Sequence, residues 1–251
     1  MSEGSINKSV LKALEILEHL DLKGPLGITE ISNGLSMDKS SVFRALNTLK
    51  SRNFVRQDAD TLKYCNSYKL LEMGSNVARQ SGLGKMANNF MRQLSRRVPG
   101  AVSLGVRDGL SVVYIDKIES DTPVRASMKV GQSLPLYCTA IGKAILAFMP
   151  ADKLNQLLSR LEIKIRTPNT HRSAETLKID LSEIRRRGYA VDNEEHIPGL
   201  FCVAAPVINS SGHVIAGLSV TNVKMVMPDD SAIKNLAREI MATAAELSST
   251  L

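Results

Sequence analysis

The chain has 251 residues, of which 43% are hydrophobic and 23% charged, and its formal net charge is +7. Its length favours two domains, and its composition is that of a soluble globular protein. No apolar run is long enough to cross a bilayer and residues 1–8 lack the apolar core of a signal peptide, so we expect a cytoplasmic protein.

The first predicted elements are three helices, of which the second and third form a helix-turn-helix. The first has helical apolar spacing from about Ser9 to Leu22. Thr29 is placed to cap the second helix, which breaks near Ser36, and Asp38 is placed to cap the third. The third helix has one apolar face, spaced at i, i+3, i+4 and i+7, formed by Val42, Ala45, Leu46 and Leu49.

The opposite face of the third helix is polar and suits a nucleic-acid groove. Helix-turn-helix proteins read bases mainly through the first residues of this helix. Arg44 can donate two hydrogen bonds to guanine, a serine hydroxyl can bond to a base or phosphate, and the Phe43 ring can touch a thymine methyl. Two short strands then resemble a wing, which would place Arg56 and Lys63 near phosphates. The residues predicted to bind DNA are Lys39, Ser40, Ser41, Phe43, Arg44, Asn47, Arg56 and Lys63.

The alternative for this region is an ordinary helical hairpin whose charges are only solvated. Between Ser36 and Lys69 there are seven basic and three acidic residues, which is the local excess that phosphate binding and electrostatic steering require. The preceding helix also supplies the third helix that such a domain needs for its core. Both features favour the DNA-binding interpretation.

Beyond the wing, helical spacing at residues 68–78 predicts a linker helix, and the chain loosens at 81–84 before a further helix predicted at 85–97. Strands are predicted at 101–106, 111–118, 124–130, 189–192, 201–208 and 214–222. Helices are predicted at 139–148, 152–160, 175–187 and 229–247. Strands at both ends with helices between them indicate an α+β fold, with a mainly antiparallel sheet flanked by helices.

Over almost its whole length the sequence resembles the IclR-type bacterial transcriptional regulators. Besides the helix-turn-helix, the resemblance lies in four blocks, at Gly131–Ala144, Arg187–His196, Gly199–Val207 and Ala216–Thr221. It implies a winged helix-turn-helix DNA-binding domain at 1–67, a linker helix at 68–84, and a GAF-like effector-binding and oligomerisation domain at 85–251. It also implies homodimers that commonly pair into tetramers.

The sequence departs from the family pattern at a few positions. Asn53 stands where glycine is usual before the wing, and Tyr64-Cys65-Asn66-Ser67 replaces the end of a Tyr-x-Leu-Gly pattern. Tyr137 replaces a common histidine. The Pro-Leu-Tyr stretch at 135–137, followed by Thr-Ala-Ile-Gly-Lys, is most similar to the branch that responds to the sugar acid 2-keto-3-deoxygluconate.

The resemblance also implies where a small oxo-acid or sugar-acid effector binds. The ligand carboxylate would meet the backbone amides of Ala140 and Ile141 at a helix N-terminus, where the helix dipole favours an anion. The side-chain contacts implied are Asp192, Cys202, Ser219 and Thr221. From the residues alone, the hydroxyls could equally satisfy backbone groups and Cys202 could be a small buried hydrophobe.

An enzyme is the competing class, with Cys202 as nucleophile and His196 as base, but such a pair requires mutual hydrogen-bond geometry and an oriented third group, which a sequence cannot supply. Three widely spaced cysteines, without a Cys-x-x-Cys pair, argue against disulfides and a structural zinc site, and we expect no cofactor and no metal. We therefore predict a repressor, not an enzyme, that binds double-stranded operator DNA and is released by its effector. The sequence does not identify the operator or the exact effector.

Overall fold

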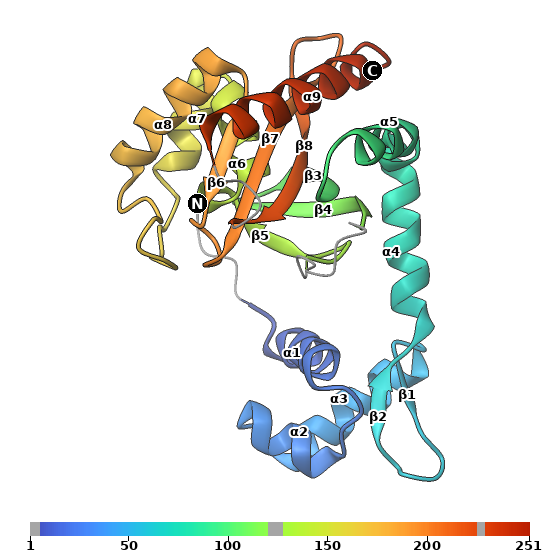
Figure 1. The fold of residues 1–251 in the computed structure, drawn as a ribbon. Helices are drawn as coiled ribbons and strands as arrows, with labels where there is room; N and C mark the ends of the chain where they lie inside the picture. Colours follow the sequence, from blue (N-terminus) through green and yellow to red (C-terminus); the bar gives the residue numbers. More distant parts are fainter. Residues whose placement is uncertain (1–5, 120–127, 225–228) are drawn as a thin grey trace. The chain divides into compact units, whose positions relative to one another are not determined.

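The computed structural model describes residues 6–119, 128–224 and 229–251, with the backbone alone at 78–81 (Figure 1). The chain divides into two compact units, Met1–Gln80 and Ser81–Leu251. Among the described residues, no helix has the length and apolar character needed to span a membrane.

The first unit contains a three-helix core, a two-stranded hairpin and a long helix. In chain order its elements are α1 (Lys8–Lys23), α2 (Ile28–Leu35), α3 (Lys39–Ser51), β1 (Val55–Gln57), β2 (Tyr64–Asn66) and α4 (Tyr68–Ser81). Strands β1 and β2 pair antiparallel, and Tyr64 of β2 also pairs with Leu26. The core that holds this unit together consists of Ile16, Leu20, Ile31, Val42, Leu46, Leu49, Val55 and Tyr64.

Local sequence explains how the helices of this unit begin. The Asp38 carboxylate accepts a hydrogen bond of 2.7 Å from the Ser41 amide, which confirms Asp38 as the N-cap of α3. The prediction of Thr29 as the cap of α2 was wrong, because the helix begins at Ile28, two residues earlier than a Thr29 cap implies. Gly27 is the N-cap there, and its amide donates to the Glu30 carboxylate at 2.7 Å. Glu30 at N3 thus bonds to the N-cap amide, as in the second half of a capping box, while the glycine cap has no side chain to accept from the helix amides.

Asn53, at the position where glycine is usual, has a left-handed backbone with φ of 61°. Glycine adopts this conformation most readily, and asparagine is among the residues that tolerate it best. The turn between α3 and the hairpin therefore keeps its geometry without glycine.

The second unit is an α+β domain built on one antiparallel sheet, as predicted. Its elements are α5 (Leu83–Arg97), β3 (Ala101–Asp108), β4 (Ser111–Ile118), β5 (Ser133–Pro135), the 3-10 turn η1 (Leu136–Cys138), α6 (Ala140–Phe148), α7 (Ala151–Leu158), α8 (Ala174–Arg187), β6 (Ala190–Asn193), β7 (Leu200–Ile208), β8 (Val214–Val223) and α9 (Asp230–Ser248). The strand order is β5-β4-β3-β8-β7-β6. Of the strand predicted at 124–130, residues 124–127 lie outside the described residues and 128–130 are not in a strand.

Two hydrophobic cores lie on opposite faces of this sheet (Figure 1). One is formed with α5 and α9, and receives alternate residues of the central strands such as Val102, Leu104, Leu218 and Val220. The other is formed with η1, α6, α7 and α8. Because strand side chains alternate between faces, the intervening polar residues of the strands face α6.

Candidate functional sites

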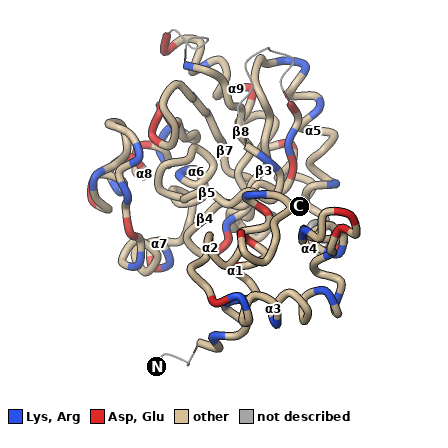
Figure 2. Tube along the Cα trace, turned by 90° about the horizontal axis from the view of Figure 1, so that it is seen from below, with Lys and Arg blue, Asp and Glu red and all other residues tan. Residues whose placement is uncertain are grey.

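The polar face of α3 is exposed in the first unit. Lys39, Ser40, Phe43, Arg44, Asn47 and the wing residue Arg56 are exposed, whereas Ser41 and Lys63 are half-buried. Phe43 is 48% exposed although it is a large apolar side chain, and it is not part of the core of this unit. Figure 2 shows the positions of basic and acidic residues along the trace of α3.

Two of the predicted contacts, Ser40 and Ser41, already take part in hydrogen bonds at the start of α3. The Ser40 hydroxyl donates to the Asp38 carboxylate at 2.7 Å, and the Ser41 hydroxyl accepts from the Lys12 ammonium at 3.2 Å. The bonds that the Asp38 carboxylate accepts from the Ser40 hydroxyl and the Ser41 amide hold the pKa of Asp38 well below its usual range. To bond to DNA, each serine hydroxyl must either keep its present bond, to Asp38 or Lys12, and bond to DNA as well, or break the present bond.

The two predicted wing cations have different surroundings. The Lys63 ammonium lies 3.4 Å from the Glu30 carboxylate of α2, whereas the Arg56 guanidinium lies 5.9 Å from the centre of the Tyr68 ring. Arg56 is the more exposed of the two and is the better placed to meet a phosphate. The sequence did not predict the role of Lys12, an α1 residue whose ammonium contacts Ser41 in the first turn of α3. A lysine on an amphipathic helix gives no sign of such a contact.

In the second unit, small residues allow the N-terminus of α6 to approach the sheet closely. A Cβ on Gly217 would lie 2.8 Å from Ile141 Cγ2, and one on Gly105 would lie 3.2 Å from the same atom. Thr139 caps the helix by accepting from the Gly142 amide at 3.2 Å, and its hydroxyl donates to the Pro135 carbonyl. The first amides of α6 therefore lie next to the polar side of β8.

A cavity of about 10 Å³, room for about one water molecule, lies at this helix N-terminus. Its lining consists of Tyr114, Met128, Thr139, Ala140, Ile141, Asp192, His196, Ile197, Leu200, Cys202 and Ser219. Five of the six predicted effector contacts are brought together here. The sixth, Thr221, is not in the lining, and its hydroxyl oxygen lies 3.2 Å from Cys202 Sγ.

Asp192 is the buried acidic group of this cavity, with 4% of its surface exposed. Its carboxylate accepts from the Glu195 amide at 2.7 Å and from the His196 amide at 3.4 Å. Burial, together with the nearby Glu195 carboxylate, raises its pKa to about 7. Asp192 can therefore be protonated near neutral pH, where it would donate a hydrogen bond to an anionic ligand instead of repelling it.

The enzyme hypothesis built on Cys202 and His196 is wrong. His196 Nδ1 lies 3.7 Å from Cys138 Sγ, while Cys202 contacts Thr221. Burial raises the pKa of the Cys202 thiol far above neutrality, and burial lowers the pKa of His196. A buried thiol that stays protonated is a poor nucleophile.

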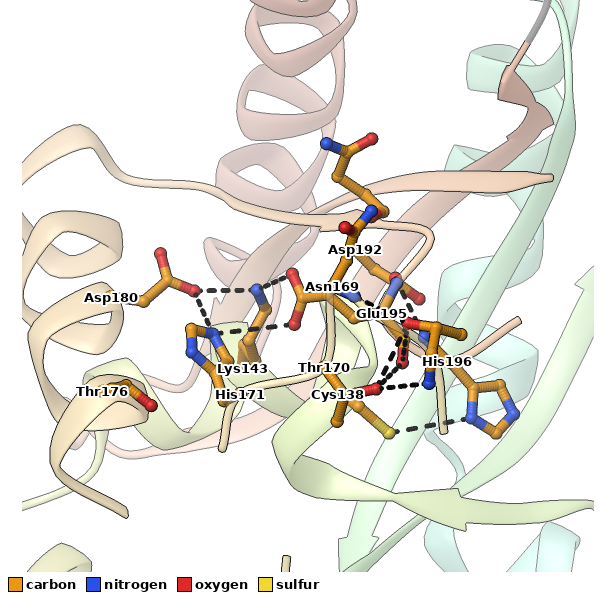
Figure 3. A network of polar contacts seen from close by, with 12 residues as sticks. Cys138, Lys143, Asn169, Thr170, His171, Thr176, Asp180, Asp192, Glu195 and His196 are labelled. Carbon is orange, nitrogen blue, oxygen red and sulfur yellow. Dashed lines mark hydrogen bonds and ion pairs between the residues drawn. The ribbon is translucent and has the colours of Figure 1, made fainter. Parts of the chain in front are cut away.

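Beside the cavity lies a buried ionic network that sequence reasoning missed. Figure 3 shows the Lys143 ammonium between the carboxylates of Asp180 and Glu195. Lys143 is 1% exposed, its distance to Asp180 is 2.8 Å, and His171 lies 3.2 Å from the same Asp180 oxygen. The sequence signal was a lone lysine within the otherwise apolar stretch Ala140–Phe148.

This network connects two sides of the cavity. Lys143 belongs to α6, whose first turn lines the cavity, and it pairs with Glu195, whose amide bonds to Asp192. The Glu195 carbonyl accepts from the Thr170 hydroxyl at 2.7 Å. His171, Asp180 and Glu195 have the donor types of a metal site, but the Lys143 ammonium occupies the space between the two carboxylates. We therefore interpret the cluster as an ion-pair network.

Comparison with known proteins gives matches to both units. Residues 9–59 match the IclR helix-turn-helix domain, and residues 75–249 match the bacterial transcriptional regulator IclR C-terminal domain. The chain is 41% identical to the HTH-type transcriptional regulator KdgR of Escherichia coli, over 85% of this chain and 81% of KdgR. It is 35% identical to XynR of the same organism, over 98% of both chains.

Solved structures agree with these matches. The Thermotoga maritima IclR structure has a TM-score of 0.80 and 34% identity, and the alignment covers 97% of this chain and 98% of that one. The C-terminal domain of Escherichia coli KdgR has a TM-score of 0.61 and 36% identity, covering 66% of this chain and 96% of that one.

Proposed function

The chain belongs to the IclR family of helix-turn-helix transcriptional regulators, and from this membership we propose that it is a repressor released from its operator by a sugar acid. The C-terminal unit is the family's effector-binding domain. The proposed effector is of the 2-keto-3-deoxygluconate class, supported by the sequence at 135–143 and by the similarity to KdgR. Because its partner is operator DNA, we place the protein in the cytoplasm.

The observation that carries the DNA-binding half of the proposal is the exposed polar face of α3. Arg44 and Asn47 lie one turn apart on it, and Phe43 stands exposed beside them. Arginine and asparagine side chains pair with guanine and adenine edges in the major groove, and an apolar ring can touch a thymine methyl. We assign base reading to α3 and phosphate contact to Lys39 and Arg56.

A repressor of this type reads two half-sites and therefore needs two copies. Helix α1 offers an apolar surface for a second copy of the chain. Val10 is 56% exposed and Leu14 51% exposed, and both line a groove of about 640 Å³ that also includes Leu17 and Phe54. Ser41 and Arg44, which are assigned to DNA, also line this groove. We propose that only its apolar side, formed by Val10, Leu14, Leu17 and Phe54, is covered in a homodimer, and that the dimers pair into tetramers.

The dimer proposal is tested by sedimentation velocity on Leu14→Glu, with Leu22→Glu as the matched control. Leu22 is 80% exposed on the same helix and is not among the groove residues. We expect Leu14→Glu to lower the mass of the assembly and to weaken binding to a duplex with two half-sites, because it places a charge in an apolar contact. An assembly unchanged by Leu14→Glu would refute this interface.

The effector half of the proposal rests on the groups that surround the cavity. The amides of Ala140 and Ile141 begin α6 and favour an anion, and Asp192 can be protonated near neutrality. A ligand larger than one water molecule must displace lining side chains, so its binding is coupled to a change of conformation. Such coupling is what allows a ligand to alter DNA affinity, provided that it prefers one conformation of the protein.

DNA binding is tested by selecting duplexes from a random library and measuring their affinity by fluorescence anisotropy. We expect a two-fold symmetric sequence and an affinity at least a thousandfold above that for unrelated duplex. Equal affinity for selected and unrelated duplexes would refute sequence-specific repression.

A further inference from the structure

The side of the sheet that faces α6 carries two neighbouring polar rows. In the first, Asp192, Cys202 and Thr221 are paired across β6, β7 and β8. In the second, Ser219 of β8 is paired with Ser103 of β3, and Ser103 with Lys117 of β4. The proposed effector contacts include all three residues of the first row but only Ser219 of the second.

The register shows that Ser103 and Lys117 face the same side as Ser219. Val102 and Leu104, the neighbours of Ser103, belong to the core with α5 and α9. The Asp116 carboxylate likewise accepts from Asn88 of α5 at 2.9 Å, so Lys117 points to the opposite face. Residues directly opposite in an antiparallel pair have Cβ atoms about 5 Å apart, which places Ser103 beside Ser219.

Ser103 is fully buried, and its hydroxyl has no hydrogen-bond partner within the described part of the chain. A buried hydroxyl without a partner is unfavourable, so such a group calls for an explanation. Among the described residues it caps no helix and joins no turn. Its location next to Ser219, which lines the cavity, makes a ligand the natural partner.

Lys117 and Met128 form the boundary beyond Ser103. The side chain of Lys117 is 6% exposed, and its ammonium donates to the Met128 carbonyl at 2.7 Å and pairs with Glu119 at 3.0 Å. Met128 lines the cavity, so Lys117 fixes a wall residue. Methionine is flexible and can move aside when a ligand enters.

We infer that the effector site extends along the sheet from Ser219 to Ser103, with Met128 and Lys117 as its far wall, and that Ser103 binds a hydroxyl group in the chain of a sugar acid. The inference rests on the proposed function and adds that Ser103 determines the preference for a longer ligand over a shorter one. A three-carbon oxo-acid held at the amides of Ala140 and Ile141 does not need this extension, whereas a six-carbon acid with hydroxyl groups fills it.

The test is isothermal titration of the full-length protein with 2-keto-3-deoxygluconate and with pyruvate. It compares wild type, Ser103→Ala and the control Ser182→Ala, which removes the same atom from an exposed serine of α8. Wild type should prefer the six-carbon acid, and Ser103→Ala should reduce that preference about tenfold, the effect of about one hydrogen bond. Ser182→Ala should bind as wild type does.

A second readout separates ligand recognition from damage to the fold. Without ligand, Ser103→Ala should unfold at the same temperature as wild type or higher, because it removes an unpartnered buried hydroxyl. Its stabilisation by 2-keto-3-deoxygluconate should nevertheless be smaller. A lower unfolding temperature without ligand, with both acids weakened equally, would overturn the inference in favour of a structural role.

The remaining outcomes distinguish this inference from the proposed function. If Ser103→Ala binds the six-carbon acid as tightly as wild type, the extension is refuted and the effector class stands. If wild type binds neither acid, the effector class and the extension are both refuted.

Discussion

The two sites are built in different ways. The surface of the first unit comes from one helix and the hairpin after it, within residues 38–63, and its cations are exposed except for the half-buried Lys63. The cavity of the second unit is assembled from residues between Tyr114 and Ser219, brought together by sheet register, and Lys143 beside it is buried between carboxylates. Substitution of a charged residue should therefore change the free energy of unfolding little at the exposed surface and much at the buried network.

The largest effect on stability is expected for Lys143→Met, in the buried network. It leaves the Glu195 and Asp180 carboxylates without their shared ammonium, and removal of one partner from a buried pair costs about 3–5 kcal/mol. We expect a loss of this size in the free energy of unfolding of the second unit, measured with urea. The control is Lys153→Met, at an exposed lysine of α7. A loss below about 1 kcal/mol would show that the network contributes little.

Asp192→Asn tests whether burial raises the pKa of Asp192, through the pH dependence of the free energy of unfolding. The folded-state pKa of Asp192 is raised from 3.8 to about 7, so the folded state holds a proton that the unfolded state releases. Its favourable contribution is complete below pH 4 and is lost as the pH rises through 7. The stability of wild type relative to Asp192→Asn should therefore fall between about pH 4 and pH 7. Parallel curves for the two proteins would contradict the raised pKa.

Arg44→Ala tests the exposed surface. We expect specific operator affinity to fall by about 1–3 kcal/mol, with relaxed preference at one base position, because one base contact is removed. The free energy of unfolding should stay within about 0.5 kcal/mol of wild type, since Arg44 is exposed. Operator selection and urea unfolding measure the two quantities. Unchanged operator affinity would remove Arg44 from base reading.

The smallest effect is expected for Arg56→Ala in the wing. A phosphate contact carries no sequence information, so binding should weaken uniformly across duplexes and the salt slope should fall by about 1. Lys63→Ala is the paired comparison, because its ammonium already lies near Glu30 and should contribute less. A change of sequence preference in Arg56→Ala would instead assign it to base reading.

What the sequence could predict follows the same division. Periodicity and capping are local, so α3 and its cap Asp38 were predicted from the residues alone. The cap of α2 was assigned to Thr29 because threonine is a good N-cap, whereas the helix begins after Gly27. The bond of Ser41 was not foreseen, since it involves Lys12 of another helix.

In the cavity, the resemblance supplied the residues on which the effector proposal rests, but not their neighbours. Tyr114, Met128 and Ile197 have ordinary apolar or aromatic side chains, and only register and packing bring them to the cavity. Ser103 was read as part of a strand, and nothing in its local sequence marks it as unpartnered. Such features depend on long-range pairing, which a single sequence does not display.

The most direct test of the central claim is the operator affinity of the full-length protein, measured by anisotropy with and without saturating 2-keto-3-deoxygluconate. Saturation is established separately by titration without DNA. Coupling between two sites typically changes affinity 5- to 150-fold, and we predict weakening within this range. The same operator affinity at saturating ligand would contradict control of this protein by a sugar acid.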